Sequence, residues 1–153
     1  MRIFLTGATG HIGSTALDAL LRAGHDVTAL VRTADKAREV AARGGRPVLG
    51  DLADPASYRD AAEAHDAYVH AAYDRSTQGA PVDRRTMETL GELAKKPRTG
   101  GGDRTLLYTS GVWVLGRTPE PADETAPVNP AAIVAWRPEV ETWVLGLARP
   151  GLR

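Results

Sequence analysis

The first 32 residues contain an apolar run, a turn with three glycines, an amphipathic segment and a second apolar run. Residues 2–6 (Arg-Ile-Phe-Leu-Thr) have the composition of a buried strand, and residues 14–23 carry alanine and leucine at helical spacing. Gly24 follows as a natural helix end, and residues 27–31 form the second apolar run. This order predicts a strand, a glycine turn, a helix and a second strand, which together make a βαβ unit of about 30 residues.

Each glycine in the turn has a separate physical role. Gly7 allows a sharp turn off the strand, Gly10 leaves room for a pyrophosphate near the backbone, and Gly13 lets the helix pack against the strand. The helix N-terminus then offers unpaired N–H groups and a partial positive charge to an anion. An ordinary tight turn is the alternative, whereas a P-loop is excluded because no Gly-Lys-Ser/Thr follows. The cofactor-binding residues that we expect here are Gly7, Thr9, Gly10, His11, Ile12 and Gly13.

The composition narrows the class of protein. The chain has 153 residues, a hydrophobic fraction of 42%, a formal net charge of zero and no cysteine. We expect one domain, residues 1–153, with a buried core. The neutral charge argues against a nucleic-acid partner, and the missing cysteine removes disulfides, thiolate metal sites and thiol catalysis, so we expect no metal. Because there is no apolar run of about 18 residues and no signal peptide, we expect a cytoplasmic protein without a membrane partner.

Apolar runs and helical patterns continue to alternate beyond the second strand. We predict strands at residues 47–50, 67–72 and 104–109, and helices at residues 34–43, 57–64 and 82–95. The glycine-rich segment at residues 98–103 is predicted to be an exposed turn. The alternation predicts an α/β fold, a doubly wound parallel sheet with helices on both faces.

The segment Thr6-Gly7-x-x-Gly10-x-x-Gly13 resembles the TGxxGxxG fingerprint of the short-chain dehydrogenase/reductase superfamily. The residues of this turn, Gly-Ala-Thr-Gly-His-Ile-Gly at positions 7–13, are most similar to those of the extended and atypical branches, which include nucleotide-sugar epimerases, dehydratases and NmrA-like proteins. The resemblance implies a Rossmann fold with strand order 3-2-1-4-5 and a sixth strand beside the fifth. Residues 150–153 have the pattern of a loop entering a strand. We therefore expect a chain truncated before the sixth strand and the substrate-binding part.

Arg32, at the end of the second predicted strand, bears on the choice of cofactor. In dinucleotide folds an acidic residue here binds the ribose of NAD, and a basic residue pairs with the 2′-phosphate of NADP. The first carboxylate after Arg32 is Asp35, and Thr33 and Lys36 could add hydrogen-bond donors. A guanidinium suits bidentate phosphate contact, so we expect NADP in preference to NAD. The alternative is a solvated arginine at the start of a helix.

Asp51 and Leu52 follow the third predicted strand. They are similar to the superfamily's Asp-Leu element, which implies that Asp51 bonds the adenine amino group and that Leu52 covers the ring. Helix capping is the competing explanation for Asp51. However, Asp54 with Pro55 behind it already serves as that cap, which favours the adenine role.

The fourth predicted strand ends in small residues. Ala71 and Ala72 resemble the H-x-A segment that lies along the cofactor ribose in extended members, where small side chains permit close approach. We expect His70 to point into the core and to have no catalytic role. Tyr73 follows at the carboxyl edge of the sheet, where ligands bind, so we expect it to form a wall at the nicotinamide side.

The sequence departs from the superfamily's pattern at the catalytic residues. Active members use a Ser or Thr after the fifth strand and a Tyr-x-x-x-Lys pair on the next helix. In register, Gly111 takes the Ser/Thr position, with Thr109 and Ser110 just before it. Arg137 takes the lysine position and Ile133 the tyrosine position. We expect Thr109 and Arg137 to contact the cofactor, and we name Ser110 and Tyr73 as the catalytic candidates.

Two functions are consistent with the sequence. The first is an NADP-dependent oxidoreductase, or an epimerase/dehydratase-like enzyme, acting on a small carbonyl or hydroxyl substrate. The second is a non-catalytic, NmrA-like dinucleotide-binding redox sensor. The missing Tyr-x-x-x-Lys pair favours the second, and the retained segment around Thr109 and Ser110 favours the first. The partner that we expect is a small-molecule substrate, and a homodimer is left open.

Overall fold

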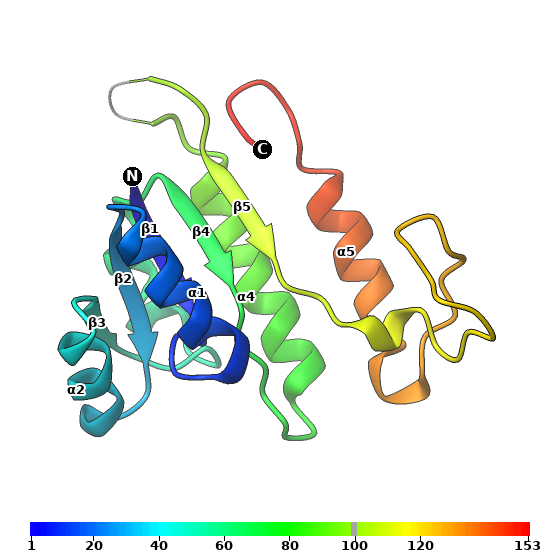
Figure 1. The fold of residues 1–153 in the computed structure, drawn as a ribbon. Helices are drawn as coiled ribbons and strands as arrows, with labels where there is room; N and C mark the ends of the chain where they lie inside the picture. Colours follow the sequence, from blue (N-terminus) through cyan, green and yellow to red (C-terminus); the bar gives the residue numbers. More distant parts are fainter. Residues whose placement is uncertain (99–100) are drawn as a thin grey trace.

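A five-stranded parallel sheet forms the centre of the computed structural model, which describes residues 1–98 and 101–153 (Figure 1). The strand order is β3-β2-β1-β4-β5, which confirms the predicted topology. Reversal of strand order on either side of β1 places a crevice at the carboxyl ends of the strands. The strands are β1 (Arg2–Thr6), β2 (Asp26–Val31), β3 (Arg46–Leu49), β4 (Ala67–His70) and β5 (Thr105–Tyr108).

Helices cover both faces of this sheet, with α1 on one side and α4 on the other (Figure 1). The helix predicted at residues 57–64 is divided in two. The dividing residue, Tyr58, has a non-helical φ of −136° and buries its ring against Phe4 at 6.1 Å between centroids. The helices are α1 (His11–Arg22), α2 (Ala34–Ala42), α3 (Arg59–Glu63), α4 (Gly79–Ala94) and α5 (Arg137–Leu145), with 3₁₀ turns η1 (Pro55–Ser57), η2 (Val112–Val114) and η3 (Ala132–Val134).

Neighbouring residues of β1 point to opposite faces of the sheet and enter two different hydrophobic cores. Phe4 packs with Tyr68, Met87 and residues of α4, whereas Leu5 packs with Leu17 of α1 and residues of β2. This alternation is the two-residue period of a strand. A sheet covered on both faces needs apolar residues at both sets of positions, which explains the continuous apolar run in the sequence.

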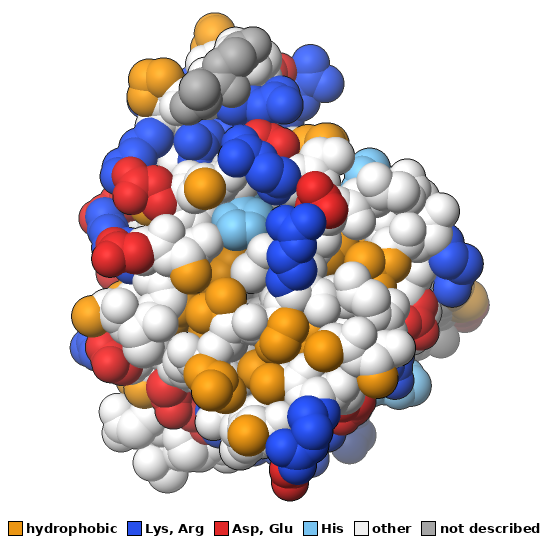
Figure 2. All heavy atoms as spheres, turned by 90° about the vertical axis from the view of Figure 1, so that its left-hand side faces the viewer, with side chains coloured by type: hydrophobic (Ala, Val, Ile, Leu, Met, Phe, Trp, Pro, Cys, Tyr) orange, Lys and Arg blue, Asp and Glu red, His pale blue; other side chains and the backbone are white. Residues whose placement is uncertain are grey.

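The two outer strands differ in what lies beside them. β3 is the edge on the side shown in Figure 2, where hydrophobic side chains gather below a region of mixed charge; its Leu49 is exposed. Pro47 is tolerated in β3 because an edge strand can lack one ladder donor. At the opposite side, Leu152 forms a parallel bridge with Arg104, directly before β5. The chain thus enters a sixth strand position at residues 150–153, as the sequence pattern predicted.

Two further observations complete the fold. In the residues that the structure describes, no helix is both long enough and apolar enough to span a bilayer. Of the exposed turn predicted at residues 98–103, Thr99 and Gly100 lie outside the described residues.

Candidate functional site: a dinucleotide cleft and an adjoining pocket

The glycine turn connects β1 to α1 at the carboxyl edge of the sheet. Gly7 has a φ of +76°, and a side chain there would meet the carbonyl of Ala71 at 2.5 Å. A Cβ atom on Gly13 would lie 2.1 Å from the carbonyl oxygen of Gly7. The turn is closed by a 2.8 Å hydrogen bond from the Gly10 N–H to the same oxygen. Glycine is therefore required at positions 7 and 13 by close backbone packing.

Gly10 is the N-cap of α1, and no side chain caps this helix end. The first turn of α1 contains no acidic residue that would offset the positive end of the helix dipole. A Cβ atom on Gly10 would meet only the Gly7 carbonyl oxygen, at 3.2 Å, and Gly10 otherwise faces open space in the cleft. These features fit a phosphate group, because backbone N–H donors and the helix dipole both point at an approaching anion.

A cleft of about 430 Å³ runs from this turn across the carboxyl ends of β2 and β3. This volume lies within the range of small-molecule sites, roughly 300–1,000 Å³. His11, Ile12 and Gly13 form the adjoining first turn of α1, and Thr109 and Arg137 lie outside the cleft. The predicted residues that line it are Gly7, Thr9, Gly10, Arg32, Asp51, Leu52, Ala71, Ala72 and Tyr73.

The end of the cleft at β2 is basic. Arg32 and Lys36 line it, although Lys36 also pairs with Glu39 at 2.8 Å. Asp35, the first carboxylate after Arg32, binds Arg38 on the exposed side of α2. The Thr33 hydroxyl oxygen caps α2 by accepting the Lys36 N–H, which leaves its O–H proton as a hydrogen-bond donor at this end of the cleft. Arg32 therefore remains the principal cation at this end.

Asp51 lines the cleft beside Leu52, as expected, but it is not free of local bonds. One of its carboxylate oxygens accepts the N–H of Ala53 at 2.9 Å, which fixes the turn after β3. Asp54 caps η1 by accepting the N–H of Ala56 at 3.2 Å, so the predicted division of roles between the two aspartates is confirmed for the cap. The hydrogen bond from the Ala53 N–H orients the Asp51 carboxylate at the cleft wall.

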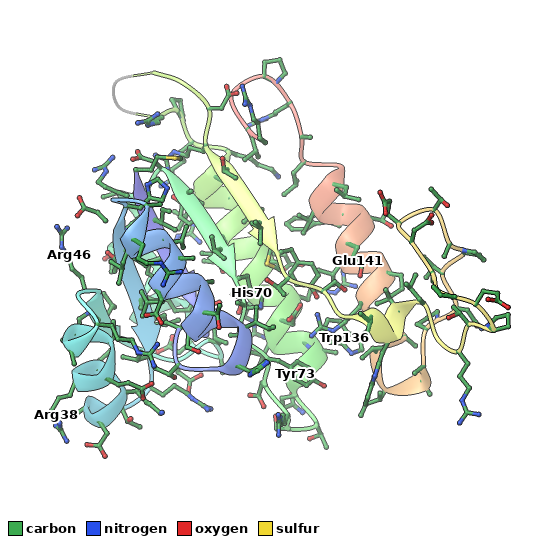
Figure 3. The ribbon with its side chains drawn as sticks, in the orientation of Figure 1. Arg38, Arg46, His70, Tyr73, Trp136 and Glu141 are labelled. Atoms are coloured by element: carbon green, nitrogen blue, oxygen red, sulfur yellow. The ribbon has the colours of Figure 1, made fainter. Side chains whose placement is uncertain are left out.

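A second pocket of about 520 Å³ adjoins the cleft and shares Tyr73 with it. Its walls are Tyr73 and Arg75, residues 110–113, and Ile133, Val134 and Arg137. Figure 3 shows Tyr73 beyond the carboxyl end of β4, with Trp136 and Glu141 on the side of α5. The two hollows thus meet at Tyr73, where the fourth strand ends.

Arg137 is the buried cation of this second pocket, with 6% of its surface exposed. Its guanidinium carbon lies 4.7 Å from the ring centre of Trp136, 5.1 Å from that of Tyr73 and 5.7 Å from that of Tyr108. Nη1 donates to the Tyr108 hydroxyl at 2.9 Å and to the Thr109 carbonyl at 3.4 Å. Stacking on three aromatic rings and two hydrogen bonds from Nη1 therefore fix the position of the Arg137 side chain.

Behind Arg137 lies a buried chain of polar groups that reaches the start of the glycine turn. The Tyr108 hydroxyl donates to Asp83 of α4 at 2.8 Å, and His70 Nε2 lies 3.2 Å from the other Asp83 oxygen. His70 Nδ1 lies 2.7 Å from the Thr6 hydroxyl. An ionised Asp83 can only accept, so His70 Nε2 is the donor in that contact, and Nδ1 pairs with the Thr6 hydroxyl.

Burial first, and then the neighbouring Asp83, raises the pKa of Tyr108 far above its usual range. Tyr108 therefore keeps its proton and serves as a donor to Asp83. His70 lies inside the fold, as predicted, and is held there by polar partners on both ring nitrogens. Sequence reasoning missed Asp83 and Tyr108 altogether.

The family model described as "NAD(P)H-binding" matches residues 7–144, which is most of the chain. The chain belongs to this family. It is 34% identical to an uncharacterised Schizosaccharomyces pombe protein, over all of this chain and 51% of the other. It is also 30% identical to a 4-hydroxy-2-methyl-3-oxo-4-farnesyl-3,4-dihydroquinoline-1-oxide ketoreductase of Stigmatella aurantiaca, over 99% of this chain and 47% of that one.

Solved structures of similar fold include epimerases. A UDP-glucose 4-epimerase from Stenotrophomonas maltophila with bound NAD superposes with a TM-score of 0.78 and 22% identity, over 97% of this chain and 48% of that one. An epimerase-like protein from Burkholderia cenocepacia gives 0.76 with 26% identity, over 95% and 49%. The chain spans about half the length of the curated relatives that it matches.

Gly111, Ile133 and Arg137, which were matched in sequence to the superfamily's catalytic positions, all line the second pocket. Ile133 lies on η3, ahead of α5, and exposes 62% of its surface beside the second pocket. The Ser110 hydroxyl donates to the carboxylate of Glu141 on α5, and Ser110 also lines the pocket. Glu141 is a partner that sequence reasoning did not assign to Ser110. Trp136 and Trp143 pack against the core.

Proposed function

We propose that this chain binds NADP and serves an oxidoreductase that acts on a small carbonyl or hydroxyl substrate. The observation that carries the proposal is the position of Arg32 in the cleft, with Asp35 turned away onto Arg38. A basic residue at the end of the second strand is the feature that accommodates a 2′-phosphate. The membership in an NAD(P)H-binding family supports the dinucleotide itself.

In this proposal each part of the cleft binds a different part of the dinucleotide. The glycine turn and the N-terminus of α1, residues 7–13, hold the pyrophosphate. Asp51 and Leu52 receive the adenine, and Ala71 and Ala72 run along a ribose. We assign the nicotinamide side to Tyr73, which joins the cleft to the second pocket, to Arg137, which stacks on the Tyr73 ring, and to Thr109, whose carbonyl accepts a hydrogen bond from Arg137.

The second pocket supplies groups for proton movement at a substrate oxygen. A nicotinamide, when bound, supplies or accepts the hydride. The Ser110 hydroxyl lines the pocket and donates a hydrogen bond to Glu141. In oxidation of a hydroxyl, Ser110 would accept the substrate proton while passing its own to Glu141, and in carbonyl reduction both transfers would run in reverse, from a protonated Glu141 through Ser110 to the substrate oxygen. Tyr73 is the second candidate, because it lies where the two hollows meet. Arg137 stays charged and holds position rather than relaying a proton. The ketoreductase relative supports carbonyl reduction as the reaction.

The alternative is a dinucleotide sensor without catalysis. It is favoured by Ile133, which stands where the superfamily has its catalytic tyrosine and has no group that can carry a proton. A sensor would bind NADP in the cleft but would show no turnover with any carbonyl compound.

Calorimetric titration of the purified chain with NADPH and, separately, with NADH tests the proposal. Tight NADPH binding with NADH at least about tenfold weaker is the expected result, since one charge-assisted phosphate contact is worth about 1.5–3 kcal/mol. Equal affinities would overturn the NADP assignment. No binding of either would overturn the cofactor assignment for this chain. A screen of carbonyl compounds with NADPH then separates the enzyme from the sensor.

A further inference from the structure

The second pocket combines two arginines with aromatic and aliphatic walls. Tyr73 and Trp113 contribute rings, and Val112 and Ile133 contribute aliphatic side chains. Among the described residues that line it, none is acidic. Val112 exposes 78% of its surface, Ile133 62% and Trp113 58%, which is a large hydrophobic exposure for neighbouring residues. An exposed apolar patch beside polar groups is typical of a binding site.

The charge of Arg137 is incompletely compensated within the described residues. Its only hydrogen-bond acceptors there are the Tyr108 hydroxyl and the Thr109 carbonyl, and both receive Nη1. Asp83 is reached only through Tyr108, and Glu141, one turn along α5, is bonded to Ser110; within the described residues no ion pair joins either carboxylate to Arg137. Burying a cation without a direct counter-charge is costly. Arg137 lines the pocket, and its Nε and Nη2 groups have no hydrogen-bond acceptor within the described residues, so an anion in the pocket would supply the counter-charge.

Arg75 gives the pocket a second cation from a different element. It lies on the exposed loop between β4 and α4 and forms no ion pair within the part of the chain that the structure describes. A planar guanidinium matches the two oxygens of a carboxylate, and bidentate pairing is the strong form of this contact. The neutral hydroxyls of a cofactor ribose would not supply the missing charge.

We infer that this pocket binds a compact, ring-containing hydrophobic carboxylate, whose anionic group is received by Arg137 and Arg75. The rings of Tyr73 and Trp113 accept the apolar part. This ligand would be the substrate of the proposed oxidoreductase, and that identification rests on the proposed function, whereas its binding to the pocket does not. The pocket's own charge and hydrophobic walls select the ligand class.

Calorimetry with 2-naphthoate and its neutral analogue 2-naphthamide tests this inference. The two probes share shape and differ in charge, so naphthoate should bind at least about tenfold more tightly. Arg75→Gln should weaken naphthoate several-fold, and Arg137→Gln should remove the difference between the two probes. Arg32→Gln is the matched control, because Arg32 lies in the dinucleotide cleft, and it should leave naphthoate binding unchanged.

Each contrary result has a definite meaning. Equal affinities for the two probes, or no binding of naphthoate, would overturn the inference. An equal loss in Arg32→Gln and Arg75→Gln would place the anion in the dinucleotide cleft and overturn it as well. Arg75 lies on an exposed loop, so its variant carries the test if Arg137→Gln does not fold. Naphthoate binding without NADPH binding would overturn only the proposed function, and NADPH binding without naphthoate binding only this inference.

Discussion

The guanidinium of Arg137 donates a hydrogen bond to the hydroxyl of Tyr108 at 2.9 Å. Tyr108 in turn donates to Asp83 at 2.8 Å, so a buried cation and a buried carboxylate are joined through one phenol. The two charges lie on α5 and α4, two helices on the same side of the sheet. Asp83 therefore acts on Arg137 only indirectly, through the phenol, and offsets its charge only in part.

Replacing Asp83 with Asn should lower the free energy of unfolding by about 1–3 kcal/mol. The amide keeps the shape but removes the charge that accepts the Tyr108 hydroxyl and offsets Arg137. Urea unfolding followed by circular dichroism measures the change. Asp60→Asn, at an exposed position on α3, is the matched control and should stay within about 0.5 kcal/mol. Equal effects of the two substitutions would contradict the coupling of Asp83 to Arg137.

Asp83 shows why the site was only partly predictable. The strands, the glycine turn and Arg32 follow local rules of spacing and composition, and the structure places them as those rules predict. The pairing of Asp83 with Tyr108 depends on two elements that meet only in three dimensions. A signal was nevertheless present, because Asp83 lies on the same helical face as Thr86, Met87 and Leu90, all of them buried. A carboxylate on an apolar face needs a partner.

The bond between Ser110 and Glu141 was unpredictable for a related reason. The two residues are 31 positions apart, and between Ser110 and the start of α5 the only helical elements are two short 3₁₀ turns. Periodicity fixes the residues within one helix but not where that helix packs after an irregular connection. The break at Tyr58 likewise reflects tertiary packing on Phe4, which overrides local helix propensity.

Replacing Arg32 with Asp should weaken NADPH by about 10- to 100-fold, the value of a charge-assisted phosphate contact. NADH, which lacks the 2′-phosphate, should lose far less. Arg85→Asp is the matched control, because Arg85 is an exposed arginine of α4 that does not line the cleft. Calorimetric titration of both variants with both nucleotides gives the comparison. A similar loss for NADPH and NADH in Arg32→Asp would mean that this residue does not read the phosphate.

Asp66, at the opposite edge of the sheet from the cleft, should make stability depend on pH. Burial would raise the pKa of Asp66, but hydrogen bonds and charge from Arg2 and a further bond from Arg98 outweigh it and hold the pKa well below its usual range. A depressed pKa contributes stability above the unfolded value, near 3.9, and that contribution is lost as the pH falls below it. Urea midpoints should therefore decline from about pH 5 downward.

Asp66→Asn identifies the source of that decline. The variant should be less stable than the parent chain at neutral pH and should show a flatter dependence below about pH 5. Asp26→Asn removes a carboxylate from the exposed pair with Arg46 and should change little, because surface pairs contribute about 0–1 kcal/mol. An unchanged pH profile in Asp66→Asn would assign the acid sensitivity to other groups.

Replacing Gly13 with Ala should reverse the usual effect of this substitution in a helix. Alanine normally stabilises a helix by about 1 kcal/mol relative to glycine. Here its Cβ would lie 2.1 Å from the Gly7 carbonyl oxygen, which is backbone and cannot rotate away. We expect a loss of about 1–3 kcal/mol in unfolding free energy, as for other overpacked sites, and weaker NADPH binding. Gly111→Ala is the control, since its Cβ would meet nothing within 4 Å. If Gly13→Ala proved as stable as that control, the glycine turn would be free to shift away from α1, and the packing argument for the phosphate site would not hold.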